Sequence, residues 1–263
     1  MTTAVITGAA SGMGAAIRQR LLDTGCRVIG IDLRDAQIHA DLSTPEGRAA
    51  AIDGALSQSG GKIDRLICCA GVGPHVDPAT LVASVNYFGV VALLDGLFDA
   101  LQQGTDPCAV VVSSNSATLQ SWAGSPLRDA YLRGDEAGVH ALVRAAMSAD
   151  ATRDQSGYVA YASAKNAVAA AARQRAAAWG RAGVRLNVVA PGAVQTPLLQ
   201  AGLDDPRYGD AIRDFLPPMG RRAEPKEVAS LIEFLCSPQA SYIHGNVVFI
   251  DGGVDAVQRP LDF

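Results

Sequence analysis

The sequence has no excess of positive charge and no long apolar run free of charged residues. Its 22 Lys and Arg residues are outnumbered by 26 Asp and Glu residues, which gives a net charge of −4. A chain with this balance offers no basic surface to nucleic acid. It also holds no uncharged apolar run of about 18 residues, the length a helix needs to cross a bilayer. We therefore expect neither nucleic acid nor a membrane among its partners.

A C-x-x-C motif is missing too. The cysteines are odd in number, and most of them lie in apolar stretches: Cys26, Cys68, Cys69, Cys108 and Cys236. This pattern is typical of buried thiols in a reducing compartment and gives no sign of a metal site. Because the first strand pattern begins by residue 4, we expect no signal peptide and a cytoplasmic location.

The chain alternates between apolar strand patterns and helical patterns along its whole length. With 263 residues, 49% of them hydrophobic, it can bury a full core, and we expect one domain, 1–263. The alternation predicts an α/β fold, a doubly wound (Rossmann) seven-stranded parallel sheet between two layers of helices. The predicted strands lie near 4–7, 27–31, 37–40, 63–69, 107–113, 184–190 and 246–250. Asp41 follows Asp32 by only nine positions, so no crossover helix fits between the second and third strands.

A glycine-rich turn follows the first predicted strand. Ala4-Val5-Ile6-Thr7 runs directly into Gly8-Ala9-Ala10-Ser11-Gly12-Met13-Gly14, and a helix is predicted over about 12–24. Glycines allow the backbone to approach a pyrophosphate, whose negative charge the free N–H groups of the helix N-terminus attract. The segment therefore predicts a dinucleotide site.

The second strand predicts which dinucleotide binds. It ends at Asp32, 18 residues beyond Gly14, near the spacing at which a carboxylate accepts hydrogen bonds from the adenosine ribose. A carboxylate there repels a 2′-phosphate, which favours NAD(H). Arg34 leaves NADP open as the alternative, since a guanidinium can accommodate that phosphate.

Tyr161 and Lys165 are four residues apart in a predicted helix and so share one face. A phenol has a pKa of about 10, and a nearby ammonium favours the phenolate and lowers that value. We therefore expect a general acid/base in which Lys165 lowers the pKa of Tyr161.

These motifs occur in a known order along the chain. The sequence carries Thr7-Gly8-x-x-x-Gly12-x-Gly14, Asp32, Asp41-Leu42, Cys69-Ala70-Gly71, Asn86, Ser114, Tyr161-x-x-x-Lys165 and Pro191-Gly192. Over almost its whole length it resembles the short-chain dehydrogenases/reductases. It departs from them at Cys68-Cys69, where the family usually has two asparagines, so we expect the backbone there to be stabilised differently.

The resemblance implies a catalytic tetrad of Asn86, Ser114, Tyr161 and Lys165. In it Tyr161 exchanges the substrate proton, Ser114 orients the substrate oxygen, Lys165 also holds the nicotinamide ribose and Asn86 supports a water path. The family pattern selects Ser114 over the adjacent Ser113. The resemblance further implies NAD-binding positions at Gly8, Ser11, Gly12, Met13, Gly14, Asp32, Asp41, Leu42, Ala70, Gly71, Tyr161, Lys165, Pro191, Gly192, Val194 and Thr196.

Ser114 and Tyr161 are 47 residues apart, far more than is usual in the family, which indicates a helical insertion over about 117–157. An amphipathic helix is predicted there, because five apolar residues share one face: Val139, Leu142, Val143, Ala146 and Met147. The insertion is a surface elaboration, a cover over the active site or an altered subunit interface. We expect His140 to lie on the polar face, and His75 and His244 to be structural.

The insertion also bears on assembly. Family members commonly pack two long helices per subunit, here about 79–103 and 158–182, against a neighbouring subunit. An extra helix directly before the second of these should obstruct that packing. We therefore expect a homodimer formed through helix 224–236 and the last strand.

A second variable segment, about 197–224, follows Thr196, which the resemblance implies as the contact of the nicotinamide carboxamide. Its apolar residues either line a substrate pocket or close the core: Leu198, Leu199, Phe215, Leu216 and Met219. With the insertion and the short second crossover, this segment resembles family members that interconvert 3α-hydroxysteroids and other carbonyl compounds. It also resembles members that oxidise aromatic alcohols such as coniferyl alcohol. A catalytically silent dinucleotide sensor is the alternative from a different class.

Overall fold

A parallel sheet forms the centre of the computed structural model, which describes residues 1–149 and 156–261. Seven strands among these residues pair in the order β3-β2-β1-β4-β5-β6-β7, so the predicted doubly wound fold is confirmed. The strands are β1 (Thr3–Thr7), β2 (Arg27–Asp32), β3 (Ile38–His39), β4 (Arg65–Cys68), β5 (Cys108–Val112), β6 (Arg185–Pro191) and β7 (Val247–Ile250).

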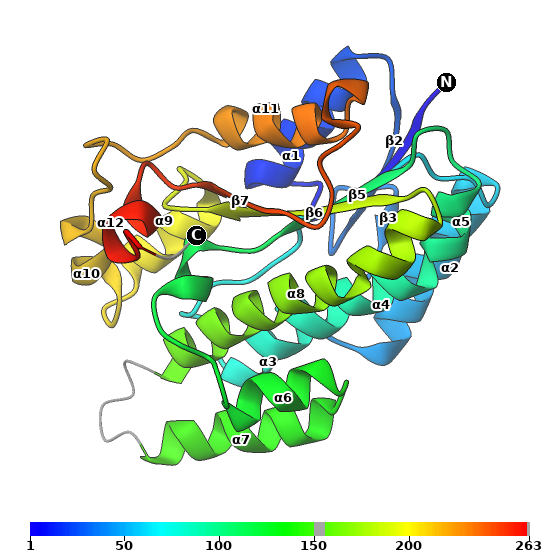
Figure 1. Ribbon diagram of the computed structural model, residues 1–263. Helices are drawn as coiled ribbons and strands as arrows, with labels where there is room; N and C mark the ends of the chain where they lie inside the picture. The colour runs from blue at the N-terminus through cyan, green and yellow to red at the C-terminus, as the bar shows by residue number, and fades with distance from the viewer. Residues whose placement is uncertain (150–155, 262–263) are drawn as a thin grey trace.

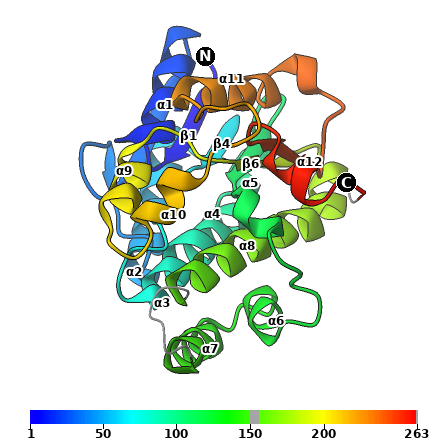
Figure 2. The same cartoon turned by 90° about the vertical axis from the view of Figure 1, so that its left-hand side faces the viewer.

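Helices cover both faces of the sheet (Figures 1 and 2). One face carries α1 (Gly12–Asp23) and α11 (Pro225–Leu235), and the other carries α2 (Pro45–Ser59), α4 (Val90–Gly96) and α8 (Ser156–Arg181). Successive side chains of a strand point to opposite faces, and β1 follows this rule. Ile6 packs in the core beside α1 and α11, whereas Val5 packs in the core on the other face.

The link between β2 and β3 is short. Residues 33–37, all of them described, contain no helix, as the spacing of Asp32 and Asp41 predicts. Helix α2 begins soon after β3, where the Thr44 hydroxyl accepts a hydrogen bond from the Gly47 N–H at 3.0 Å and caps the helix. The short link before β3 and the Thr44 cap after it together hold the segment that contains Asp41 in position.

The predicted helix 79–103 is broken into several pieces. It consists of α3 (Ala79–Ala83), a π-helix η1 (Ser84–Gly89), α4 and α5 (Phe98–Gln102). The stretch Ala79–Gly96 is long and apolar enough to cross a membrane, with a mean hydropathy of 1.4, but 67% of it is buried inside the folded protein. Its apolar side chains therefore have partners in the core.

The described part of the insertion includes the helices α6 (Pro126–Leu132) and α7 (Glu136–Ala149). They pack against α3 and α8, on the side of these helices away from the sheet (Figures 1 and 2). Val139 and Val143 are buried, as predicted for an amphipathic helix, whereas the prediction for Leu142 is wrong because 36% of it is exposed. The side chain of Met147 lies outside the described residues.

The contact face of α7 explains the error at Leu142. Polar residues share this face, because Glu136 bonds Arg48 and His140 contacts Ser84. The contact face of α7 is therefore centred nearer to Glu136 and His140 than the apolar pattern predicts. Leu142 lies at the outer edge of this face. The expectation that His140 lies on the outward polar face is wrong for the same reason.

The remaining helices lie near the carboxyl ends of the strands or connect elements. They are η2 (Asn115–Thr118), α9 (Pro197–Asp204), α10 (Gly209–Asp214), η3 (Pro238–Ala240) and α12 (Val254–Gln258). Helices α9 and α10 lie within the variable segment 197–224 and close one end of the molecule (Figure 1).

Candidate active site

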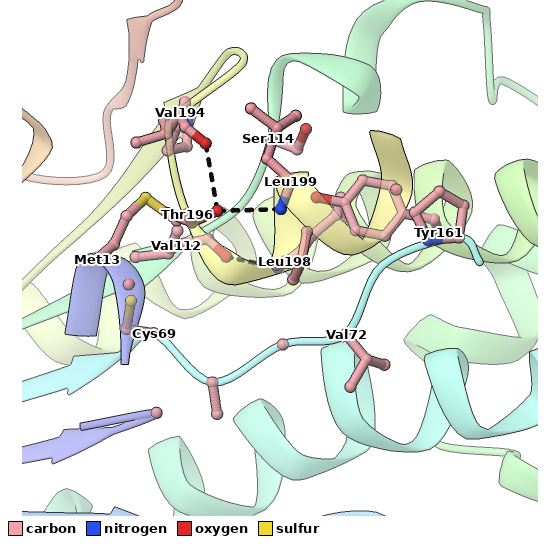
Figure 3. A pocket seen from close by; sticks show the side chains of 18 of the residues that line it. Met13, Cys69, Val72, Val112, Ser114, Tyr161, Val194, Thr196, Leu198 and Leu199 are labelled. Atoms are coloured by element: carbon pink, nitrogen blue, oxygen red, sulfur yellow. Dashed lines mark hydrogen bonds between the residues drawn. The ribbon is translucent and has the colours of Figure 1, made fainter. Parts of the chain in front are cut away.

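A cavity of about 630 Å³ opens at the carboxyl ends of β1, β4, β5 and β6. Ligands of doubly wound sheets bind at this edge, where the strand order reverses. Every cofactor position implied by the family resemblance lines the cavity: Gly8, Ser11, Gly12, Met13, Gly14, Asp32, Asp41, Leu42, Ala70, Gly71, Tyr161, Lys165, Pro191, Gly192, Val194 and Thr196. In Figure 3, Met13 and Cys69 lie at one end of the drawn pocket and Tyr161 at the other.

The glycine-rich turn forms a cradle at the N-terminus of α1. A Cβ at Gly14 would lie only 2.0 Å from the carbonyl oxygen of Gly8, so the helix can approach the turn only with glycine here. Ser11 precedes the helix, and within the described structure its side chain makes no capping bond. The first N–H groups of α1 therefore remain available to a phosphate, as the dinucleotide prediction requires.

Asp32 is held at the wall of the cavity by two backbone donors. The N–H of Ala10 donates to its Oδ2 at 2.9 Å, and the N–H of Leu33 donates to its Oδ1 at 2.7 Å. Each oxygen keeps a further lone pair for ribose hydroxyls. Arg34, the residue that favours NADP, is exposed and is absent from the described lining.

The backbone after β4 is stabilised by Thr7 and Asn86. The Thr7 hydroxyl accepts hydrogen bonds from the N–H groups of Cys69 (3.1 Å) and Ala70 (3.0 Å). The Asn86 amide both accepts from the Val72 N–H and donates to the Val72 carbonyl, each at 2.9 Å. These bonds hold the backbone that follows Cys68, and whether they differ from the usual family arrangement stays a prediction. Burial raises the pKa of Cys69 to about 12, so this thiol is uncharged near neutral pH.

Asn86 lies behind the cavity wall and is fully buried. A Cβ added at Gly71 would lie 3.1 Å from Asn86 Oδ1 and 3.4 Å from Lys165 Nζ, so both side chains crowd the same backbone segment. The structure thus brings Asn86 close to Lys165, while its role in a water path remains a prediction.

Lys165 is fixed in place by strand β5. Only 4% of the residue is exposed, and its Nζ donates to the Val112 carbonyl at 2.9 Å. Burial lowers its pKa to about 8. The Nζ lies 5.9 Å from the centre of the Tyr161 ring, so the two residues share one face of α8 as predicted.

The ring of Tyr161 is partly buried and lies beside Ser114 at the cavity. Burial raises the pKa of Tyr161, and a hydrogen bond with Ser114 acts in the opposite direction. In the protein alone, burial disfavours the phenolate and outweighs this bond, so the net shift of the pKa is upward. The lowering expected from Lys165 stays a prediction.

Ser113 and Ser114 have different partners. The Ser113 hydroxyl donates to the Lys165 carbonyl at 2.7 Å. Ser114 Oγ instead accepts from the Ser116 N–H at 3.1 Å and the Ser116 hydroxyl at 2.9 Å, which orients it beside Tyr161. The geometry therefore favours Ser114 as the serine that can contact a substrate oxygen.

Thr196 connects β6 to the variable segment. Its hydroxyl donates to the Val194 carbonyl and accepts from the Leu199 N–H, both at 3.2 Å, which caps α9 (Figure 3). This capping brings Leu198 and Leu199 to the cavity. Phe215 also lines the cavity, as predicted.

The prediction was wrong for Leu216 and Met219. Met219 is 66% exposed and lines a second, smaller cavity, and Leu216 is absent from the described lining of the main one. The chain beyond α10 has turned away from the site by these positions. Several lining residues were missed by sequence reasoning: His75, Leu119, Tyr158, Tyr208 and Ile212. Of these, Tyr158 could have been found, since it precedes Tyr161 by three positions on the same helix.

Known proteins match this chain over its whole length. A family profile described as short chain dehydrogenase matches residues 2–127, and one described as enoyl-(acyl carrier protein) reductase matches residues 136–255. The chain is 52% identical to 3-alpha-hydroxysteroid dehydrogenase/carbonyl reductase of Comamonas testosteroni, and the alignment covers 100% of both proteins. The chain belongs to the short-chain dehydrogenase/reductase family.

Two further relatives place this short-chain dehydrogenase/reductase within the family. It is 33% identical to coniferyl-alcohol dehydrogenase of a Pseudomonas species, with 95% of each chain covered. Among solved structures, 3-alpha-hydroxysteroid dehydrogenase of Pseudomonas sp. B-0831, complexed with NADH, superposes with a TM-score of 0.94 at 51% identity and 100% coverage of both chains.

This short-chain dehydrogenase/reductase is an oxidoreductase that interconverts an alcohol and a carbonyl compound with a nicotinamide dinucleotide. A nicotinamide dinucleotide held in this cavity would supply the hydride chemistry. The protein must provide a group that exchanges the hydroxyl proton and donors that hold the substrate oxygen. Tyr161 and Ser114, which lie together at the cavity, have the chemistry for these two tasks.

Proposed function

We propose that this enzyme interconverts a secondary alcohol and a ketone on an apolar substrate such as a 3α-hydroxysteroid, with NAD(H) as cofactor. The observation that carries the proposal is the position of the Ser114 and Tyr161 pair, which adjoins an apolar part of the same cavity. That part is lined by Leu119, Leu198 and Phe215. An apolar wall with a few polar groups at one end is typical of sites for small apolar ligands.

In the oxidation direction, Tyr161 takes the proton from the substrate hydroxyl. Ser114 donates a hydrogen bond to the substrate oxygen and holds it beside the phenol. Lys165, fixed by Val112, keeps a positive charge near the phenolate as it forms. In the reduction direction, Tyr161 returns the proton to the carbonyl oxygen.

Asp32 supports the choice of NAD over NADP. Its carboxylate lines the cavity and is oriented by two backbone N–H groups. The 2′-phosphate of NADP would meet this fixed negative charge. The solved relative that binds NADH supports the same choice.

The activity is tested by the absorbance of reduced nicotinamide on mixing the protein and NAD with a panel of alcohols. The panel pairs a 3α-hydroxysteroid with its 3β epimer, and adds coniferyl alcohol and a short aliphatic alcohol. We expect the 3α-hydroxysteroid to give the highest kcat/KM, and Tyr161→Phe to serve as the inactive control. A higher kcat/KM for coniferyl alcohol would replace the steroid with an aromatic alcohol, and no turnover with any alcohol would favour the sensor function.

We further propose that the enzyme is a cytoplasmic homodimer. The cytoplasmic location is supported by its cysteines, all five of which are described and free. The dimer is supported by the position of α6 and α7, which cover the outer side of α3 and α8 (Figure 2).

A further inference from the structure

We propose that Glu136, a residue of the insertion, positions the adenine end of the cofactor site through Arg48. The inference rests on the proposed use of a dinucleotide and assigns the insertion a role in binding it. Glu136 acts here as a positioning residue, because it meets the cofactor site through the buried guanidinium of Arg48 and the backbone of Leu42.

Arg48 joins the insertion to the cavity wall. Its Nη1 and Nη2 donate to the two carboxylate oxygens of Glu136, both at 2.7 Å. Its Nε donates to the carbonyl of Leu42 at 2.9 Å, and Nη2 also donates to the carbonyls of Ser43 (3.1 Å) and Ser84 (3.3 Å). One planar guanidinium thus contacts three parts of the chain at the same time: the insertion, the residues Leu42 and Ser43 (the Leu42 segment) and the first residue of η1.

The Leu42 segment is part of the cofactor site. Asp41 and Leu42 both line the cavity, and they follow Ala40, whose N–H donates to the carbonyl of Asp32, the residue expected at the adenosine ribose, at 3.0 Å. Leu42 is also confined from the other side, since a Cβ at Gly89 would lie 3.0 Å from the Leu42 Cβ. The Arg48 bonds to the carbonyls of Leu42 and Ser43 therefore decide how far the Leu42 side chain extends into the cavity.

Arg48 needs Glu136 to remain in this position. The guanidinium side chain is only 9% exposed, and a buried cation without a counter-charge is strongly disfavoured. Ser84 donates a further hydrogen bond to Glu136 at 2.7 Å and lies 2.9 Å from His140 Nε2. Burial raises the pKa of Glu136, but the hydrogen bonds from Arg48 and Ser84 outweigh it and hold the pKa below its usual range. Glu136 is therefore ionised near neutral pH.

The simpler role for this ion pair is to fasten the insertion to the domain. Arg48→Lys separates the two roles, because a lysine can still pair with Glu136 but its single nitrogen cannot also span to the Leu42 carbonyl. Glu136→Gln removes the charge that keeps Arg48 in place. The matched control is Asp95→Asn, which disrupts another two-bond pair, Arg175 with Asp95, between α8 and α4.

The experiment measures binding without turnover, so it stands even if the proposed substrate is wrong. The Kd of NADH is measured by fluorescence titration, and those of AMP and nicotinamide mononucleotide by competition. For both Arg48→Lys and Glu136→Gln, we expect the Kd of NADH and of AMP to rise about tenfold. The Kd of nicotinamide mononucleotide should stay within about twofold of wild type, as should all three dissociation constants of Asp95→Asn.

Two results would overturn the proposal. In the first, Arg48→Lys and Glu136→Gln lower the melting temperature but leave AMP binding unchanged, which assigns the ion pair to fastening the insertion alone. In the second, nicotinamide mononucleotide binding weakens as much as AMP binding, which indicates a general loss of structure. If Glu136→Gln does not fold, Arg48→Lys still decides between these outcomes.

Discussion

Lys165 Nζ lies 5.9 Å from the centre of the Tyr161 ring and donates to the Val112 carbonyl at 2.9 Å. The ammonium is therefore held by strand β5 and not by the phenol. We therefore expect the two residues to have different roles. Lys165 provides a fixed charge at the Tyr161 end of the cavity, whereas we expect Tyr161, bonded to Ser114, to exchange the proton.

Replacing Tyr161 with phenylalanine should remove proton transfer and little else. We expect kcat to fall by about 10²–10⁴-fold, the usual contribution of general acid/base catalysis, with the Kd of NADH close to that of wild type. Lys165→Ala should reduce both kcat and cofactor affinity. Steady-state kinetics and NADH titration measure the two effects. If Tyr161→Phe kept more than about a tenth of the wild-type kcat, another group would have to be the acid/base.

Replacing Ser114 with alanine should shift the pH dependence of alcohol oxidation. The Ser114 hydrogen bond lowers the pKa of Tyr161, so its loss raises that pKa and leaves less phenolate at a given pH. The alkaline rise of kcat/KM should move to higher pH, and the rate near neutral pH should fall. Ser113→Ala is the control, since Ser113 bonds the Lys165 carbonyl and should leave the position of the profile unchanged. An unchanged profile in Ser114→Ala would remove Tyr161 as the titrating group.

Replacing Asp32 with alanine should relax the choice of cofactor. The carboxylate that faces the position of a 2′-phosphate is lost, so kcat/KM with NADP should rise relative to that with NAD. Wild type should prefer NAD, and Arg34→Ala should change the ratio little, because Arg34 is exposed. A wild-type preference for NADP would contradict the prediction and make Arg34 the determinant.

The sequence predicted the sheet and most of the cavity wall because these depend on local signals. Strand periodicity located the strands, and the glycine turn with Asp32 located the nucleotide cradle. Tyr161 and Lys165 share a face because helical spacing is fixed. In each case the deciding residues are close in sequence.

The errors arose where packing between distant segments decides the outcome. Leu142 has the spacing of a buried residue. However, Arg48 and Glu136, which are 88 residues apart, bond to each other and so turn the Glu136 side of α7 toward the domain, which leaves Leu142 partly exposed. Nor does any spacing reveal the burial that raises the pKa of Tyr161. Met219 is apolar but lies where the chain has already left the main cavity.

The last prediction concerns assembly. Helices α6 and α7 pack on the outer side of α3 and α8, so they should obstruct a bundle formed by segments 79–103 and 158–182 of two subunits. The surface near α11 and β7 instead exposes two large residues, Phe234 (42%) and Tyr242 (101%). Exposed apolar side chains of this size are typical of interfaces. We therefore expect light scattering to report about 54 kDa, twice the 27.2 kDa of the chain.

Two variants test where the dimer forms. Phe234→Glu places a charge on the surface near α11 and β7 and should give a species of the 27.2 kDa chain mass. Leu142→Glu places the same charge on the exposed edge of the insertion and should leave the dimer intact. A tetramer whose interface contains segments 79–103 and 158–182 would refute the obstruction. Helices α6 and α7 contribute no residue to the described lining of the cavity. If the tetramer formed, the insertion would therefore act on the active site only through the contact between Glu136 and Arg48.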